Sequence, residues 1–164
     1  MPIRNAAKAI ILDHGRILVN RNQNTLGDMC YGLQNGDVYY DLPGGGQNQY
    51  ETLEDAVRRE CLEETGHVVR VERLCAIFEE ISHNERFRAQ YEQYAHKVHF
   101  VFLCRLTGER GALSAEMDLD MLGSEWIRVE DIKGIPLYPE RIRGNLDALL
   151  RSEQPVYLGS ELYQ

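Results

Sequence analysis

Alternating apolar and polar residues predict a chain built mainly of β-strands. Two such stretches, Ile3 to Leu12 and Arg16 to Arg21, flank His14-Gly15 and are typical of a β-hairpin. His96 to Leu106 is apolar on both faces, so we expect it in the centre of a sheet. Further strands are predicted at Val38 to Leu42, Val68 to Ile81, Glu125 to Val129 and, as an edge strand, Val156 to Leu158.

Two helices and two polar loops complete the predicted order of elements. An apolar stripe at helical spacing follows Thr52, which begins a variant of the capping box, and Gly66 stands where a helix commonly ends. A second helix is predicted from Arg141 to Arg151. The segments from Asn22 to Asp37 and from Ser82 to Glu92 are polar, and we predict both to be loops.

The first helix carries a feature that helix packing does not explain. Its apolar stripe continues as Glu60, Glu63 and Glu64, whose spacing places them on one helix face. Such like charges repel by roughly 0.2–0.5 kcal/mol per pair, and the helix dipole disfavours carboxylates in the last turn. A solvated acidic patch is the simpler interpretation. A divalent cation would remove both penalties, and all-carboxylate ligands suit Mg²⁺, Mn²⁺ or Ca²⁺ rather than Zn²⁺.

A run of glycines lies shortly before this helix. Gly44, Gly45 and Gly46 follow the strand end, and we predict a turn there in which the backbone can approach a ligand closely. A plain turn between a strand and a loop is the alternative for the glycines taken alone.

Together, the glycines and the helix resemble the Nudix box of the Nudix hydrolase family. The pattern is Gly-x5-Glu-x7-Arg-Glu-U-x-Glu-Glu-x-Gly-U, in which U is a bulky apolar residue. Gly45, Glu51 and the run from Arg59 to Gly66 supply every fixed residue of the pattern. Only His67, at the second U position, departs from it.

This resemblance implies a fold and a reaction. The fold would be of the α/β class, an α/β/α sandwich with a mixed β-sheet, in which the box forms a loop-helix-loop. The reaction would be metal-assisted attack of water on a pyrophosphate linkage in a nucleoside diphosphate bonded to another group. The implied cofactor is Mg²⁺, with Mn²⁺ as the alternative.

The resemblance also implies roles for residues of the box. Glu60, Glu63 and Glu64 would be the catalytic metal ligands, and which glutamate acts as general base stays open. The carbonyl of Gly44 or Gly45 would add a further ligand to the metal. Glu51 and Arg59 would support the loop-helix-loop through a salt bridge.

Several residues outside the box are further candidates. Similarity to the family suggests Glu125, which precedes Trp126, as an extra metal ligand or base; the alternative is a strand residue facing solvent. Arg21 ends the second strand and is a candidate phosphate contact, with a surface arginine as the alternative. His96 and His99 lack metal spacing and are interpreted as core or rim residues. Glu116, Asp118 and Asp120 are also candidates for the site, with residues of a solvated loop as the alternative.

Composition narrows the class of protein. The 164 residues carry a net charge of −8, which argues against a broad nucleic-acid surface. No run of 18 apolar residues and no secretory segment is present, so we expect a single cytoplasmic domain over residues 1–164 without a membrane span. The four dispersed cysteines fit a reducing compartment, and the apolar strands leave a homodimer open.

Two functions are consistent with these observations. The first is a Mg²⁺-dependent pyrophosphohydrolase acting on a nucleotide derivative, such as a nucleoside triphosphate or ADP-ribose. The second is a Nudix-fold module that binds or senses a nucleotide without cleaving it. The complete set of glutamates favours catalysis, because a binder need not retain all three.

Overall fold

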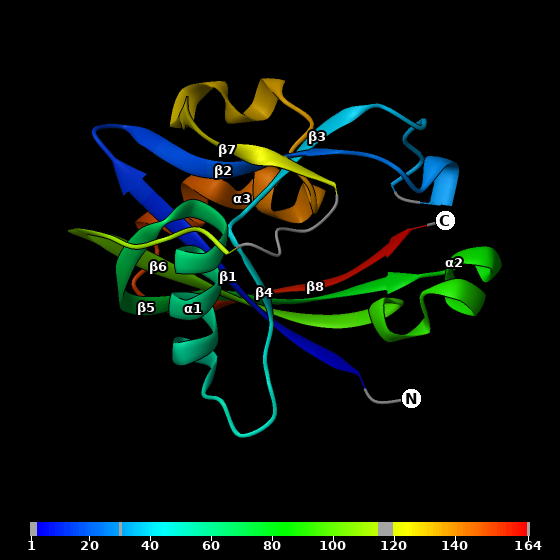
Figure 1. The fold of residues 1–164 in the computed structure, drawn as a ribbon, viewed down its shortest axis with the longest axis horizontal. Helices are drawn as coiled ribbons and strands as arrows, with labels where there is room; N and C mark the ends of the chain where they lie inside the picture. Colours follow the sequence, from blue (N-terminus) through cyan, green and yellow to red (C-terminus); the bar gives the residue numbers. More distant parts are fainter. Residues whose placement is uncertain (1–2, 30, 115–119, 164) are drawn as a thin grey trace.

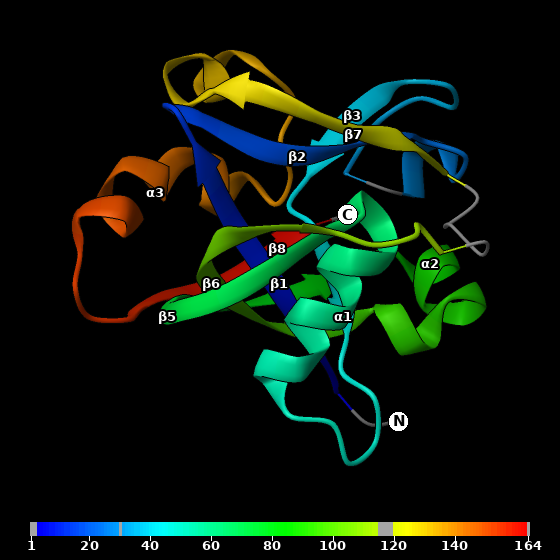
Figure 2. The ribbon, with the colours of Figure 1, turned by 60° about the vertical axis from the view of Figure 1, so that its left-hand side comes forward.

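The computed structural model describes residues 3–29, 31–114 and 120–163, whose strands form one mixed eight-stranded sheet. One layer contains β4, β1, β6, β5 and β8, and the other contains β3, β2 and β7 (Figures 1 and 2). β1 is parallel to β6, β6 is antiparallel to β5, and β5 is parallel to β8 at the edge. The strands are β1 (Arg4–Asp13), β2 (Arg16–Gln23), β3 (Val38–Asp41), β4 (Gly44–Gly46), β5 (His67–Ser82), β6 (His96–Arg110), β7 (Met121–Arg128) and β8 (Val156–Tyr163).

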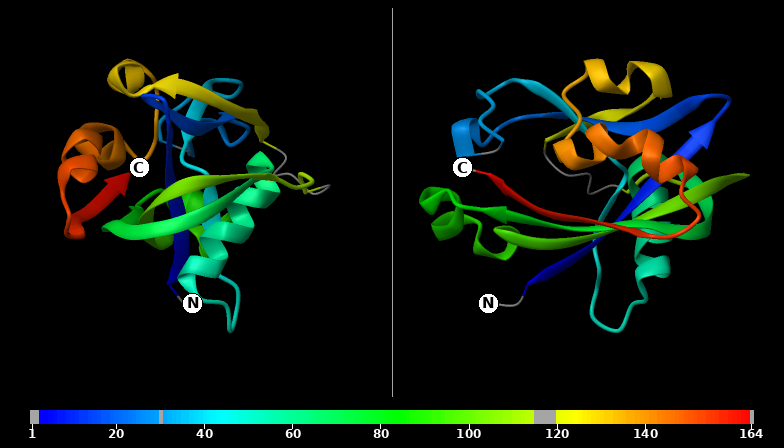
Figure 3. Two further views of the ribbon diagram at one scale, coloured as in Figure 1. Left: turned by 90° about the vertical axis from the view of Figure 1, so that its left-hand side faces the viewer. Right: turned by 180° about the vertical axis from the view of Figure 1, so that it is seen from behind.

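Two helices cover the strands from opposite sides. α1 (Leu53–Thr65) and α3 (Glu140–Arg151) flank them in the left panel of Figure 3. Residues of β1 alternate between two hydrophobic clusters: Ala9 and Ile11 pack with α1, whereas Ile10 packs with α3. The predicted α/β/α sandwich with a mixed sheet is therefore confirmed. No helix in the described ranges is long and apolar enough to cross a membrane.

The predicted ends of α1 agree with the structure. The Thr52 side chain accepts a hydrogen bond of 3.1 Å from the Asp55 amide, as a helix N-cap does. At the other end Gly66 adopts a left-handed conformation, and its amide donates to the Leu62 carbonyl at 2.9 Å. Ala56 and Val57 are fully buried, so the apolar stripe faces the sheet as expected.

The hairpin of β1 and β2 opens the space that becomes the site. The two strands pair only at their junction, through Leu12 with Ile17 and Asp13 with Arg16. Beyond these pairs β2 turns away and pairs with β3 and β7. The two layers of the sheet therefore diverge toward the beginning of β1.

Several predicted elements need correction. The three glycines form β4 and pair with β1, rather than forming a turn. The predicted loop from Ser82 to Glu92 contains α2 (Glu85–Gln90), which was missed because its stabilising features are only the Asn84 cap and one buried residue, Phe87. The last three strands are longer than predicted. The described ranges also contain the short 3-10 helices η1 (Gly27–Met29), η2 (Glu92–Tyr94) and η3 (Val129–Gly134).

We expect Thr52→Ala to lower the free energy of unfolding by about 1 kcal/mol, because the first turn of α1 loses its side-chain cap. Urea denaturation of both proteins in chelator measures the difference. Thr52→Ser keeps the hydroxyl and should be close to the unsubstituted protein. Equal losses in both variants would contradict the capping role.

Candidate active site

The candidate site lies on the layer of the sheet that contains β1, β5 and β6. Along one face of each of these strands, the side chains change from apolar to charged or polar. Successive inward positions are two residues apart, because side chains alternate across a strand. The apolar member of each row belongs to the core cluster under α3, and the next one is polar and lines a cleft. The rows run from Ile10 to Lys8 on β1, from Phe78 to Glu80 on β5, and from Val101 to His99 and Lys97 on β6.

Two adjoining cavities make up this cleft. The larger, of about 570 Å³, contains most of the tyrosines, and the smaller, of about 280 Å³, contains the backbone of β4 and two of the three glutamates. They adjoin because they share lining residues, which are Lys8, Gly44, Glu64, Tyr94, Lys97 and His99.

Glu64 stands at the junction of the two cavities. Its Oε2 accepts hydrogen bonds from Asn20 Nδ2 at 2.7 Å and from the Gly44 amide at 2.8 Å. Burial raises the pKa of Glu64 to about 7, although the charge of Lys8 opposes this shift. The last turn of α1 is thus tied to β2 and β4 through one carboxylate oxygen.

Arg59 organises the other acidic residues of the box. It forms a bidentate ion pair with Glu51, in which Nε donates to Oε1 at 2.8 Å and Nη2 donates to Oε2 at 2.9 Å. The predicted salt bridge is therefore present. Its hydrogen bond to Glu51 holds the pKa of that carboxyl at about 2. Arg59 Nη1 also donates to Glu60 Oε1 at 2.7 Å and to Glu63 Oε2 at 3.2 Å.

The absence of a side chain at position 45 allows the Glu60 carboxylate to lie on the backbone of β4. A Cβ on Gly45 would come within 2.7 Å of all three carboxylate atoms of Glu60. Any other residue would therefore displace this carboxylate. The fixed glycine of the box thus has a steric reason in this chain.

Lys8 is a component of the site that sequence reasoning missed. Its ammonium donates to Asp41 Oδ2 at 3.0 Å and to the carbonyls of Leu42 and Gly44 at 3.1 and 2.5 Å. Burial alone lowers the pKa of Lys8, but the charges of Asp41 and Glu64 raise it above its usual value. The sequence did contain a sign of this role, because Lys8 lies among the alanines of an apolar strand. A buried ammonium group needs partners of opposite charge or hydrogen-bond acceptors.

The donor set fits a hard divalent cation. Glu60, Glu63 and Glu64 each have one carboxylate oxygen that bonds to no described residue, and such oxygens are the ligands that Mg²⁺ prefers. In the structure, however, no three acidic, histidine or cysteine side chains of the described residues are grouped closely enough to hold a metal ion. Arg59 holds two of these carboxylates, and Asn20 with Gly44 holds the third.

Two candidates from outside the box lie on a different face. Asn20 reaches Glu64, so its neighbour Arg21 projects from the opposite side of β2. Glu125 lies next to Ser124, which donates to Asn20 Oδ1, and therefore also projects away from Glu64. A hydrogen bond from Tyr40 to Glu125 raises the pKa of Tyr40. Neither Arg21 nor Glu125 is among the described residues that line the cleft.

Of the three acidic candidates in the loop before β7, Asp120 belongs to the described residues. Asp120 lines the larger cavity, and its carboxylate accepts a hydrogen bond of 2.7 Å from Thr25. Glu116 and Asp118 lie outside the described residues. Of the described residues of this loop, Asp120 adjoins the cleft.

A buried ionic group on the cleft floor was also missed from the sequence. Glu80 is 1 % exposed, and its carboxylate accepts hydrogen bonds from Tyr31 at 3.0 Å and from His99 at 2.8 Å. Its third partner is the ammonium of Lys97, at 2.9 Å. Burial alone raises the pKa of Glu80, but the positive charge of Lys97 and the bond from His99 lower it below its usual value. His99 was expected in the core or at its rim, and it is 3 % exposed.

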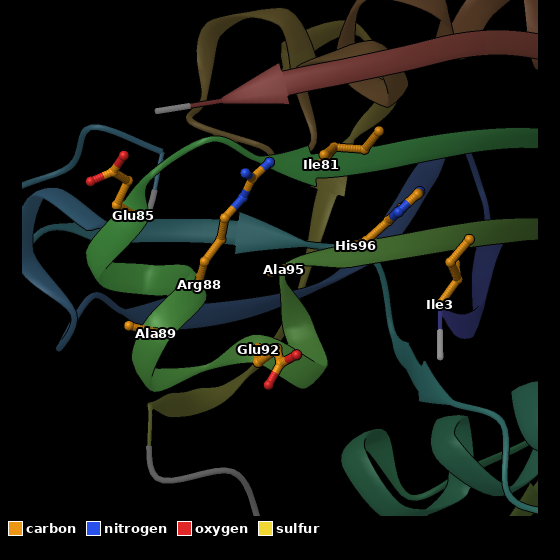
Figure 4. Close-up of a pocket in the computed structure, with 8 residues that line it drawn as sticks. All are labelled: Ile3, Ile81, Glu85, Arg88, Ala89, Glu92, Ala95 and His96. Atoms are coloured by element: carbon orange, nitrogen blue, oxygen red, sulfur yellow. The ribbon is translucent and has the colours of Figure 1, made fainter. Parts of the chain in front are cut away.

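A separate cavity of about 570 Å³ lies beside α2 (Figure 4). Ile81 and His96 line it, and each is adjacent in sequence to a residue of the cleft floor, Glu80 or Lys97. Because side chains alternate, this cavity lies on the opposite face of the sheet from the cleft. None of the three box glutamates lines it.

Comparison with known proteins places this geometry in a family. The model of the NUDIX domain matches residues 2–148. The chain is 33% identical over 92 residues to "Putative nudix hydrolase 1" of Caenorhabditis elegans, a match that covers 56% of this chain and 21% of that protein. The chain thus spans about a fifth of the length of this curated relative.

Solved structures show the same fold. An ADP-ribose pyrophosphatase from Streptococcus suis has a TM-score of 0.62 at 21% identity, over 98% of this chain and 100% of that one. The MutT protein from Bacillus halodurans has a TM-score of 0.67 at 21% identity, over 99% and 91% of the two chains. The family match spans most of the sequence, and the chain belongs to the Nudix family.

Proposed function

We propose that the protein hydrolyses a pyrophosphate linkage in a nucleoside diphosphate bonded to another group, with Mg²⁺ as the cofactor and Mn²⁺ as a substitute. The observation that carries this proposal is the position of two box glutamates, Glu60 and Glu64, in the lining of the cleft. There they adjoin the β4 backbone, the cations Lys8 and Lys97, and a cavity lined by tyrosines. Aromatic rings suit a nucleobase, and cations suit phosphate oxygens.

In this proposal Glu60, Glu63 and Glu64 hold the divalent cation. When bound, Mg²⁺ offsets phosphate charge and acidifies a water molecule. Of the two glycine carbonyls considered, that of Gly44 accepts from Lys8, so we favour the carbonyl of Gly45 as a further ligand. One of the glutamates takes the proton from the attacking water.

Other residues position these groups. Lys8 fixes the turn between β3 and β4, and Arg59 on α1 holds the carboxylates of Glu51, Glu60 and Glu63. Both cations lower the repulsion among the carboxylates before any metal binds. The proposal does not use Arg21 or Glu125, because they project away from Glu64.

We also place the enzyme in the cytoplasm. Cys61, Cys75 and Cys104 are buried and form no disulfide. Such cysteines fit a reducing compartment.

We expect the protein to cleave at least one member of a panel of nucleoside triphosphates, ADP-ribose, dinucleoside polyphosphates and capped RNA. Turnover should require Mg²⁺ or Mn²⁺ and stop in chelator, because the ligands are carboxylates. Release of phosphate or nucleotide measures it. If the protein binds a nucleotide tightly but cleaves none, it is a sensor and the proposed hydrolysis is wrong.

Glu63→Gln and Glu64→Gln should each reduce Mg²⁺-dependent turnover by about 100-fold or more, because each removes a charged ligand. Steady-state kinetics measures the loss, and circular dichroism checks the fold. Glu54→Gln on the same helix is the matched control, since that side chain is 56% exposed and pairs with Arg58. Full Mg²⁺-dependent activity in both test variants would contradict the ligand assignment.

In chelator, Glu64→Gln should stabilise the protein above pH 7 by on the order of 3 kcal/mol, because the unsubstituted protein must ionise a buried carboxyl. The folded pKa of about 7 lies above the ordinary value of 4.5, so this penalty grows as the pH rises from 4.5 to 7 and vanishes below 4.5. Denaturation at pH 5 and pH 8 measures it. A change in stability that is the same at both pH values would contradict the assignment to Glu64.

A further inference from the structure

The smaller cavity contains an arginine that the proposed hydrolysis does not yet use. Arg4, at the start of β1, lines this cavity together with Glu60, Glu64 and the β4 backbone. Its Cα lies opposite that of Lys97 in the parallel pairing of β1 and β6. Two cations thus stand side by side at the wall of the cavity that contains the proposed metal ligands.

The guanidinium of Arg4 is held in place by contacts with an aromatic ring and with backbone, and not by a carboxylate of the described residues. It lies over the ring of Tyr94, 4.9 Å from the ring centroid, and against the backbone of Gly46. A Cβ at position 46 would collide with Arg4 Nη2. Within the described part of the chain, no carboxylate forms an ion pair with Arg4, although acidic residues outnumber basic ones 26 to 18.

Lys97 is fixed by a different route. Its ammonium bonds to Glu80 Oε1 at 2.9 Å, and Glu80 is in turn held by Tyr31 and His99. An ammonium has three donors, so this one bond leaves others for a ligand. The Lys97 side chain is 19% exposed and lines both cavities.

The two cavities differ in the residues that line them, so the two ends of the cleft differ in chemistry. Tyr31, Tyr39, Phe87, Tyr91 and Tyr163 line only the larger cavity, Glu64 and Lys97 line both, and Arg4 lines only the smaller. A nucleotide whose base lies among the tyrosines therefore extends past Glu64 and Lys97 toward Arg4. The far end of such a substrate meets the planar guanidinium of Arg4, which pairs with no described carboxylate. This group matches a phosphate better than a neutral sugar.

We propose that Arg4, Tyr94 and Lys97 form a subsite for the phosphate farthest from the nucleoside, and that the enzyme accordingly prefers nucleoside triphosphates to nucleotide sugars as substrates. This inference rests on the proposed hydrolysis of nucleotides. Arg4 binds the terminal phosphate, Tyr94 keeps the guanidinium flat against β4, and Lys97 contacts the phosphate chain nearer Glu64.

The test compares Arg4→Gln with a matched control, Arg16→Gln. Arg16 also lies over an aromatic ring, 5.7 Å from the centroid of Trp126, but it is outside the cleft. We expect Arg4→Gln to lower kcat/KM for ATP and GTP by about 10- to 100-fold, mainly through KM, as the loss of charge-assisted hydrogen bonds does. Activity toward ADP-ribose should change less than about threefold, and Arg16→Gln should alter neither.

Two further variants, Arg4→Lys and Tyr94→Ala, separate loss of the phosphate contact from loss of the fold. Arg4→Lys should recover part of the activity toward triphosphates, and thermal melts verify that each variant is folded. Tyr94→Ala should weaken triphosphate hydrolysis in the same direction as Arg4→Gln. Equal losses for ATP and ADP-ribose, or no loss for either, would overturn the subsite while leaving hydrolysis intact.

Binding separates this inference from the proposed function. A methylene-bridged ATP analogue should bind the unsubstituted protein at least about tenfold more tightly than Arg4→Gln, as measured by calorimetry in Mg²⁺. If the protein cleaves no nucleotide but shows this difference, hydrolysis is wrong and the phosphate subsite stands. If the analogue binds both proteins equally, the subsite is wrong regardless of turnover.

Discussion

The hydrogen bonds of the Lys8 ammonium are the interaction on which the site most depends. The ammonium of Lys8 joins β1 to the end of β3 and to the first residue of β4, because it donates hydrogen bonds to Asp41, to the Leu42 carbonyl and to the Gly44 carbonyl. The carbonyls of Leu42 and Gly44 and the carboxylate of Asp41 would otherwise crowd negative charge into a space shielded from water. Their attraction to Lys8 fixes β4, whose backbone contacts Glu60 and Glu64.

The same requirement for compensated charge shapes the rest of the cleft. Glu80 remains ionised because Lys97 and His99 surround it, and the acidic end of α1 is stable because Arg59 spans Glu51, Glu60 and Glu63. Each of these buried or half-buried carboxylates thus has a fixed partner of opposite sign. Such fixed charges need little rearrangement when an anionic ligand binds, which is an advantage for a catalytic site.

The box helix was predictable because its information is local. Capping, apolar spacing and the three glutamates all lie within one run of residues, and the structure places Thr52 and Gly66 at the helix ends as predicted. The cleft floor was not predictable in this way. Glu79 and Glu80 are neighbours in sequence, and only the pairing of β5 with β6 decides which one faces inward.

The positions of Arg21 and Glu125 show the same limit. β2 is buried on both faces from Ile17 to Asn20, so its pattern does not reveal which face reaches α1. The hydrogen bond from Asn20 to Glu64 determines the answer, and it joins residues 44 positions apart. Long-range register, rather than residue type, separates the residues of the cleft from those behind it.

The last glycine of β4 has a consequence for how relatives of this protein diverge. The family pattern fixes Gly45 but leaves position 46 free, whereas in this chain Gly46 provides the surface on which the Arg4 guanidinium lies. A side chain at position 46 would move that guanidinium without obstructing the strand, because only the tip of a flexible residue stands in its way. Positions 4 and 46 should therefore covary: lineages that keep the arginine should keep the glycine, and those that lose one should be free to lose the other.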